Sequence, residues 1–250
     1  SFATGTTGTI TINGGTLKYV DAGAAFPGTA ASGGGRFTLN SNGILALDNA
    51  GTSNVNNRLG LNAIGTLDIQ GGKLTINGTS KASTPTTETI TTFNVTNGNG
   101  RIELSADAAN PLTLAITTLN TANGNGSLVV TGINGAASAN GVARLTITTP
   151  NLISGQGTGI NGTVTMGVRH DILADASVSG LGTGFLVKDS VTNNYRALAS
   201  NELLSSIALP LTTDVDTVTA GNQGAGLANV GLAGVTQGLM GNSVGNTPTV

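Results

Sequence analysis

The densest polar group of the sequence is Arg169-His170-Asp171 with Asp175, and it contains the only histidine of the chain. An imidazole beside two carboxylates could serve in general acid-base catalysis or bind a metal ion. A closed metal site needs about four ligands, which one histidine and two nearby carboxylates do not supply. The alternative interpretation is a solvated loop or a capped turn, and we favour it.

Asp214 and Asp216 are a second candidate, because residues two apart on a strand share one face. With loop carbonyls they could bind Ca²⁺, which prefers oxygen ligands. The glycine-rich calcium nonapeptide with its regular aspartate is absent. Calcium binding at these two residues is left open.

Tyr195 and Arg196 could form a stacked recognition pair. An aromatic side chain beside arginine can also simply cover the edge of a hydrophobic core, which is the interpretation we favour.

The remaining acids give little support for an enzyme. A polysaccharide lyase or hydrolase needs clustered acidic and basic side chains on adjacent elements. The chain has twelve acids, and most of them stand alone. We therefore predict no catalytic residue, no cofactor-binding residue, no metal ligand and no cofactor, and a protein that is not an enzyme.

Composition restricts the fold class. Charged residues make up 9% of the 250 residues, against about 25% in an ordinary globular domain. Hydrophobic residues make up 38% and the net charge is −2, which argues against disorder. The near-neutral balance offers no basic stripe for a phosphate backbone, so we expect no nucleic-acid partner.

The large side chains are few: five Phe, two Met, two Tyr and no Trp. We therefore expect a narrow interior filled by aliphatic residues. No apolar run approaches the roughly 18 residues of a membrane-spanning helix, so no transmembrane helix is expected. The absence of cysteine suits a bacterial secreted repeat protein. The start at Ser1-Phe2 suggests a processed form or a fragment.

A repeated strand pattern supplies the elements that must position these side chains. In residues 59–79, Leu67 and Ile69 alternate with polar residues, Gly71-Gly72 turn a corner, and Leu74 and Ile76 resume the alternation. Period-two alternation places such residues on one face of a strand. We predict that these four residues point inward in one coil, which stacks on Leu45 and Leu47.

The same pattern recurs in residues 8–20, 35–48 and 92–105. Leu17, Leu45 and Leu74 follow one another at 28 and 29 residues, and Ile102 follows 28 residues later. Regular return at this period is typical of stacked supersecondary units. The predicted fold is all-β: a right-handed parallel β-helix (β-solenoid) with a thin aliphatic core and loop insertions. Outward Thr and Asn residues are expected to stack in ladders.

Two segments, 21–34 and 78–90, are predicted to be loops. Residues 1–180 are assigned to the solenoid repeat region and 181–250 to a Gly-rich continuation that caps the solenoid or joins subunits. Within that continuation we expect a strand at 184–189, a turn at 192–194, a strand at 195–198 and a short helical turn at 201–204. A further strand is expected at 214–219.

The phrases TITINGGTLKYV, FTLNSNGILALD and GTLDIQGGKLTINGT resemble the autotransporter-associated β-strand repeat of bacterial surface and secreted proteins. A second phrase, GFLVKDSVTNNYRALASNE, resembles a segment of very large repeat proteins of environmental bacteria. The first resemblance covers roughly residues 8–150. It implies a right-handed parallel β-helix, export, and a role as a surface or secreted passenger, adhesin stalk or fibre.

Two function hypotheses follow. The first is a non-catalytic, secreted or cell-surface bacterial solenoid that acts as a filament subunit or an adhesin stalk. It would self-associate by end-to-end stacking or strand addition, because uncapped solenoid ends are open sheet edges. The alternative is a carbohydrate-binding or carbohydrate-cleaving β-helix. Partners outside the chain would be a surface glycan or another cell-surface ligand, with a site in the loops at 21–34 or 78–90 as a third hypothesis.

Overall fold

The computed structural model describes residues 8–20, 35–50, 54–59, 65–81, 83–121, 126–150 and 159–203. They form thirteen strands and the short 3₁₀ helix η2 (Ser200–Glu202). The strands are β1 (Thr9–Ile12), β2 (Gly15–Val20), β3 (Arg36–Asn40), β4 (Gly43–Asp48), β5 (Thr66–Gln70), β6 (Lys73–Asn77), β7 (Thr86–Ser105), β8 (Leu112–Thr121), β9 (Gly126–Thr131), β10 (Ala143–Thr149), β11 (Val168–Asp175), β12 (Gly184–Lys188) and β13 (Tyr195–Ala197). In this described part of the chain, no helix is long and apolar enough to cross a bilayer.

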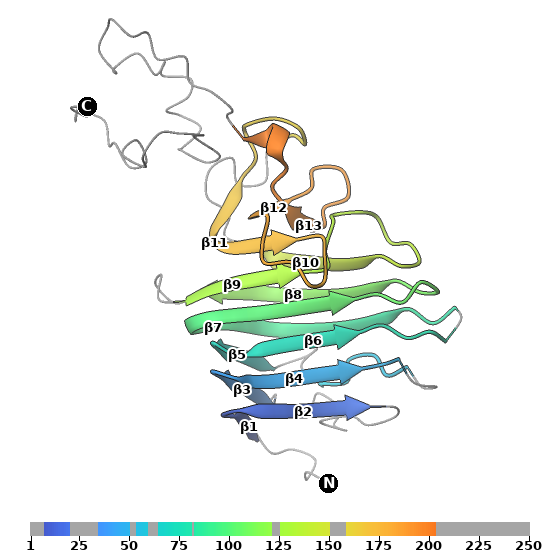
Figure 1. Cartoon of the computed structure of the whole chain (residues 1–250), viewed down its shortest axis with the longest axis vertical. Coiled ribbons are helices and arrows are strands. Elements are labelled where there is room, and N and C mark those ends of the chain that lie inside the picture. Colours follow the sequence, from blue (N-terminus) through green and yellow to red (C-terminus); the bar gives the residue numbers. More distant parts are fainter. Residues whose placement is uncertain are drawn as a thin grey trace, which may run out of the picture.

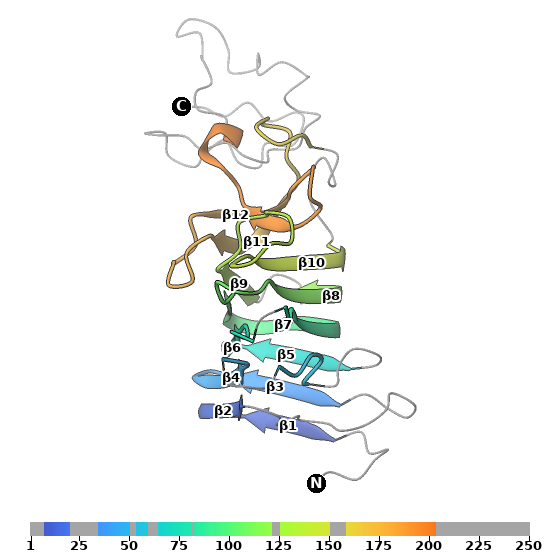
Figure 2. The same cartoon turned by 90° about the vertical axis from the view of Figure 1, so that its right-hand side faces the viewer.

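The strands stack in two series, here named sheet A and sheet B, which lie on different sides of the molecule. Sheet A is the parallel series β1, β3, β5, the first half of β7, β8 and β10, seen broadside in Figure 2. Sheet B is the parallel series β2, β4, β6, the second half of β7, β9 and β11, seen broadside in Figure 1. The chain alternates between the sheets, so each coil adds one strand to both. The expected all-β parallel β-solenoid is confirmed.

Inward residues of successive coils lie directly on one another. Leu74 and Ile76 are the register partners of Leu45 and Leu47, as predicted. On sheet A, Leu67 and Ile69 stack in the same way on the inward residues of β3, Phe37 and Leu39. All of these side chains are fully buried or nearly so, and they belong to one continuous, almost entirely aliphatic core.

The outward faces carry the expected ladders of polar side chains. Asn120 donates a hydrogen bond to Asn94 (2.9 Å), and Asn94 donates one to the Asp68 carboxylate (2.7 Å). At the corner of the first coils, Asn40 donates to Asn13 (2.6 Å). Each bond joins neighbouring coils, so the Asn content contributes to holding the stack together.

The two sides of a coil differ in how they connect the sheets. From sheet A to sheet B the chain turns in two residues, for example at Asn13-Gly14 and Gly71-Gly72. A Cβ on Gly72 would lie 2.7 Å from Leu39 Cβ and 2.8 Å from the carbonyl oxygen of Asn40, so the close approach of the preceding coil requires glycine. The return connections from sheet B to sheet A are longer and vary in length, as at 49–65 and 78–85.

One loop boundary was predicted wrongly. Residues 78–90 were expected to form a loop, but β7 begins at Thr86 and pairs with β8 from that residue onward. The inward positions there are Thr86, Glu88 and Ile90, all buried. Two polar residues at inward positions hide the alternation that marks the other strands. The segments 21–34 and 214–219 lie outside the described residues.

The parallel stack ends in an antiparallel hairpin. Beyond β11 the chain forms β12, turns, and forms β13, and both new pairings are antiparallel. The hairpin lies over the end of the stack in Figure 1. Strand, turn, strand and helical turn occur in the predicted order, with η2 in place of the turn expected at 201–204. Tyr195 is fully buried, and its hydroxyl donates to the Ile147 carbonyl of β10 at 3.4 Å, which joins the hairpin to sheet A.

Candidate functional site

The Arg169 group is divided among separate roles. Arg169 and Asp171 lie on β11 and form a two-bonded ion pair, with Nε to Oδ1 at 2.8 Å and Nη2 to Oδ2 at 2.7 Å. The guanidinium also donates to the Thr121 hydroxyl at 2.9 Å and to the Pro150 carbonyl. Burial alone would raise the pKa of Asp171, but the hydrogen bonds and charge of Arg169 hold it below its usual range. The pair therefore joins β11 to the ends of β8 and β10.

Asp175 and His170 do not join that pair. The Asp175 carboxylate is buried and accepts the backbone N–H groups of Ser177 (2.9 Å) and Gly182 (3.2 Å). Asp175 therefore caps the turn between β11 and β12, in line with the capped turn that the sequence suggested as an alternative to a catalytic or metal site. His170 is exposed. The described residues contain no group of three or more His, Cys, Asp or Glu side chains placed to hold a metal ion.

Arg196 belongs to a cluster, here named the cap cluster, that consists of two buried acids (Asp189 and Glu202) and two partly buried residues (Arg196 and Asn161). Arg196 Nη2 lies 2.6 Å from Glu202 Oε1, and its Nε lies 3.0 Å from Asp189 Oδ2. Asn161 donates to Asp189 at 2.7 Å and accepts from Arg196 at 3.0 Å. Because Tyr195 points into the core, Tyr195 and Arg196 form no exposed recognition pair.

Hydrogen bonds hold both acids of the cap cluster ionised. Burial would raise the pKa of Asp189, but the N–H groups of Thr192 and Val191, with Arg196 and Asn161, lower it to about 2. Burial would likewise raise the pKa of Glu202, but Arg196 and the N–H groups of Gly162 and Ala199 lower it. The ion pairs and hydrogen bonds of the cap cluster thus hold the hairpin and η2 against the segment around residue 161.

Another buried acid, Glu88, anchors the segment 54–59. Its two carboxylate oxygens accept the backbone N–H groups of Arg58 (2.8 Å) and Leu59 (2.9 Å). Burial raises the pKa of Glu88 to about 7, and the two backbone donors and the Arg58 charge act in the opposite direction. Glu88 thus has a pKa near neutrality in a structural position.

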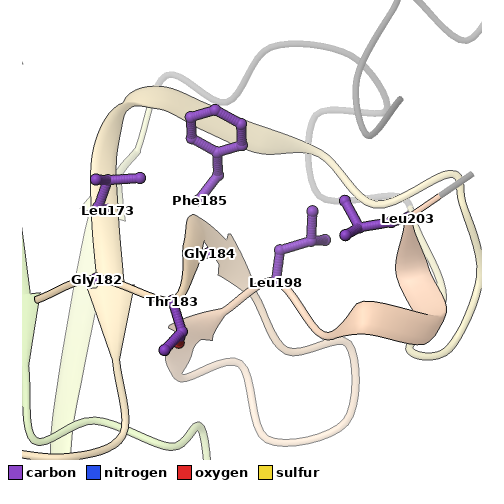
Figure 3. Close-up of a pocket in the computed structure, with 7 residues that line it drawn as sticks. All are labelled: Leu173, Gly182, Thr183, Gly184, Phe185, Leu198 and Leu203. Atoms are coloured by element: carbon purple, nitrogen blue, oxygen red, sulfur yellow. The ribbon is translucent and has the colours of Figure 1, made fainter. Parts of the chain in front are cut away.

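The hollow beside the hairpin is apolar (Figure 3). It measures about 240 Å³, which is below the usual 300–1,000 Å³ of small-molecule sites. Its one side-chain hydroxyl, from Thr183, donates to the Ala174 carbonyl at 3.4 Å. Its lining includes no acid or base that could catalyse a reaction. The lining residues are Leu173, Gly182, Thr183, Gly184, Phe185, Leu198 and Leu203.

Sequence reasoning missed both clusters, although a signal existed. Their partners lie one coil apart: Arg58 and Glu88 are 30 residues apart, and Asn161 and Asp189 are 28 apart. The outward pair Lys73–Glu103 shows the same spacing of 30. A search for opposite charges at the repeat period would have found this pair and the Arg58–Glu88 contact. Asp214 and Asp216 lie outside the described residues.

The two ends of the solenoid differ in how well the core is covered. At the C-terminal end, Leu145, Ile147 and Ile172 are at most 5% exposed under the hairpin. At the other end, β1 pairs with β3 and β2 with β4, and no described strand pairs with the opposite edges of β1 and β2. We name their four inward side chains the N-terminal end face: Ile10, Ile12, Leu17 and Tyr19.

The end-face residues continue the inward columns of the core, but they are less buried than the residues of the later coils. Ile10 and Leu17 are the register partners of Phe37 and Leu45, which are fully buried, yet both are only partly buried themselves. Comparison with known proteins adds no assignment, because no family model, no curated protein and no solved structure matches the chain.

Proposed function

We propose that this chain is a non-catalytic structural module. It would be a secreted or cell-surface bacterial β-solenoid that acts as a rod-like stalk or as the subunit of a fibre. The observation that carries the proposal is the continuous main core that extends from Ile12 in the first coil to Tyr195 in the hairpin. In a solenoid each coil contacts only its neighbours, so length can be added without changing the cross-section.

The charged side chains support the same proposal. Lys18 pairs with Asp48 at 2.6 Å, and Lys73 pairs with Glu103 at 3.0 Å, in each case between neighbouring coils. Exposed pairs of this kind contribute little stability, on the order of 0–1 kcal/mol. Their partners are other coils of the same chain, which suits a spacer better than a charged binding groove. Export and bacterial origin rest on the repeat resemblance and on the absence of cysteine.

Mechanical unfolding of single molecules tests the rod. The chain has no cysteine, so Thr16→Cys and Val191→Cys would supply attachment points near the two ends. Because stability is distributed over neighbouring coils, we expect extension in several small steps rather than one rupture. One all-or-none event over the whole length would contradict a coil-by-coil spacer.

The alternative is a carbohydrate-binding or carbohydrate-cleaving solenoid. It has one specific observation in its favour, the partly buried Arg169–Asp171 ion pair on the last parallel strand, which also carries Asp175. A polysaccharide panel with a reducing-end assay distinguishes the two functions. Turnover that is abolished by Asp171→Asn or Asp175→Asn, in variants that keep the wild-type circular dichroism spectrum, would replace the structural proposal.

A further inference from the structure

Asparagine is followed by glycine at ten positions of this chain. At such a step the backbone nitrogen of the glycine can attack the side-chain amide carbon of the asparagine, because glycine has no side chain to hinder the approach. Attack requires that this nitrogen is not held elsewhere, that the amide is free to meet it, and that close packing does not fix the glycine. The structure describes eight of the ten steps, and they differ in these three respects. They begin at Asn13, Asn42, Asn77, Asn97, Asn99, Asn134, Asn140 and Asn161.

At three steps the glycine nitrogen is held by an acceptor outside the step. The N–H of Gly162 donates to the buried Glu202 carboxylate at 2.9 Å, and that of Gly78 donates to the Ser105 carbonyl at 2.8 Å. The N–H of Gly141 donates to two carbonyls of the connection between β7 and β8, at 3.1 and 3.3 Å. Each nitrogen would have to give up its hydrogen bond before it could attack, so these three steps are protected.

At three further steps the asparagine oxygen accepts a hydrogen bond from another residue. This bond restrains the side-chain amide and keeps it from turning toward its own glycine. The donors are Asn40 to Asn13 (2.6 Å), the Ser127 hydroxyl to Asn99 (2.6 Å) and the Ala136 N–H to Asn134 (3.0 Å). At the seventh step, Asn42-Gly43, the glycine is buried, and a Cβ on it would clash with the Ile12 carbonyl oxygen. Such close packing resists the backbone rotation that ring closure requires.

The eighth step, Asn97-Gly98, meets all three requirements. Both residues are exposed at the corner where β7 passes from sheet A to sheet B. A Cβ on Gly98 would come no closer than 3.3 Å to any atom beyond its chain neighbours, so Gly98 is less tightly packed than Gly43. The N–H of Gly98 donates to the side-chain oxygen of Asn97 itself at 3.0 Å. This hydrogen bond places the attacking nitrogen beside the amide carbon and polarises the amide, as in a near-attack conformation.

We propose that Asn97 is a modification site, where the chain deamidates through a cyclic imide with Gly98 ahead of the other steps that the structure describes. The Gly98 nitrogen loses its proton to solvent and forms a bond with Cγ of Asn97, and the amide nitrogen leaves as ammonia. Water then opens the imide. If the bond from the nitrogen to Cγ breaks, the product is aspartate, and if the bond to the backbone carbon breaks, it is isoaspartate. Overall, water is consumed and ammonia is released, without an oxidant or a reductant.

The two products affect the solenoid differently. Either one adds a negative charge at the corner. Isoaspartate also lengthens the main chain between Asn97 and Gly98, because Cβ becomes part of it. Gly100 is buried, and a Cβ on it would clash with Ile69 of the preceding coil, so this corner has little room for a longer chain. Isoaspartate should therefore weaken the pairing of β7 with β9 that begins at Gly98, whereas aspartate should leave it intact.

Peptide mapping of the aged full chain tests the site. The folded protein is kept in mildly alkaline buffer, and samples taken over time are digested with trypsin and sequenced by tandem mass spectrometry. Cleavage after Lys81 and Arg101 releases residues 82–101, which contain Asn97 and Asn99 together. We expect conversion at Asn97 to be faster than at Asn99 by about tenfold or more, with isoaspartate among the products.

The same chain in guanidinium chloride supplies the matched control. Unfolding removes every contact that distinguishes the eight steps, so their rates should approach one another. Asn97→Gln should abolish conversion at this position and leave Asn99 unchanged, because glutamine would have to close a larger ring. Faster conversion at another described step of the folded chain would overturn the proposal, as would an intact Asn97 after a time that converts the unfolded chain. A lead of Asn97 that persists unchanged in guanidinium chloride would show that the fold does not select it. None of these results bears on the rod, which is tested by mechanical unfolding and by polysaccharide turnover.

Discussion

Arg196 of β13 and Glu202 of η2 are joined by two hydrogen bonds of 2.6 and 2.8 Å between guanidinium and carboxylate. Glu202 is 1% exposed, so the acid is ionised in a site with little access to water. Breaking a buried ion pair by removing one partner leaves the other charge uncompensated, which costs about 3–5 kcal/mol. The Arg196–Glu202 pair is therefore expected to contribute strongly to the stability of the C-terminal hairpin and η2.

The first prediction concerns this pair. Arg196→Met should lower the free energy of unfolding by roughly 3 kcal/mol, because Asp189 and Glu202 lose their shared counter-ion. Urea denaturation measures the loss, and hydrogen exchange should quicken first in β13 and at the edges it covers. Lys81→Met removes a cation from an exposed position and should change stability by less than about 0.5 kcal/mol. Equal losses of stability in the two variants would show that the ion pairs of Arg196 do not stabilise the hairpin.

The second prediction is a pH dependence set by Glu88. Its pKa is about 7 in the folded chain against an ordinary 4.5, so the folded state binds the proton more tightly than the unfolded state. The resulting stability is fully present below pH 4.5 and is lost as the pH rises through 7. The expected decrease between pH 5 and 8 is at most roughly 3 kcal/mol. Chemical denaturation at several pH values measures it, and Glu88→Gln should flatten the slope. Identical slopes in both proteins would show that another group titrates.

Asp189 gives the opposite sign at acid pH, which is the third prediction. Its folded pKa is about 2 against an ordinary 3.8, so its contribution is present above pH 3.8 and is lost as the pH falls through 2. Asp189→Asn should remove the share of the acid destabilisation between pH 4 and 2 that comes from Asp189, while Glu202 and Asp171, whose pKa values are also lowered, keep theirs. Thermal melts across that range measure the difference from the wild-type chain.

The fourth prediction compares register partners at the end and in the interior. Leu45→Ala removes a fully buried side chain and should cost about 2–5 kcal/mol. Leu17→Ala removes its partner in the first coil, which is only partly buried, and should cost roughly 1 kcal/mol. Denaturation at concentrations where the chain is monomeric measures both. Similar losses would mean that the first coil is covered in solution.

The fifth prediction concerns the tight corner. Gly72→Ala brings a Cβ within 2.8 Å of two backbone carbonyl oxygens of the preceding coil, those of Asn40 and Gly43, and should cost about 1–3 kcal/mol. Gly14→Ala is the control at the corner of the first coil, where a Cβ would meet no atom within 4 Å. Its expected change is below about 1 kcal/mol. Thermal unfolding of the two variants, measured side by side, decides the point.

The strands and their register could be predicted because the same alternation recurs at a fixed period. Leu45, Leu74 and Ile102 occupy one column of the core, as their spacing indicates. The start of β7 could not be predicted, because Thr86 and Glu88 occupy inward positions where aliphatic residues were expected. Inward polar residues are tolerated when they are hydrogen-bonded, and those bonds come from segments distant in the sequence.

The candidate site was also beyond sequence reasoning, because its contacts come from distant segments. Four polar residues close in sequence suggested a cluster around His170, but Arg169 donates hydrogen bonds to Thr121 and Pro150, which lie 48 and 19 residues away. The hairpin's strands followed from its turn residues. Its antiparallel pairing with β11 did not, because that pairing depends on where the parallel stack ends.

The difference between the two corners of a coil also bears on engineering. An added residue at Gly71-Gly72 would shift the following strand and turn its core side chains outward. Additions to the exposed part of a return connection, such as 137–140 between β9 and β10, avoid the core residue Ile133 and leave both sheets in register. Foreign peptides could therefore be grafted along one flank of this molecule at intervals of one coil, with the core unchanged. Such a chain would be a scaffold that presents epitopes at a regular spacing of one coil.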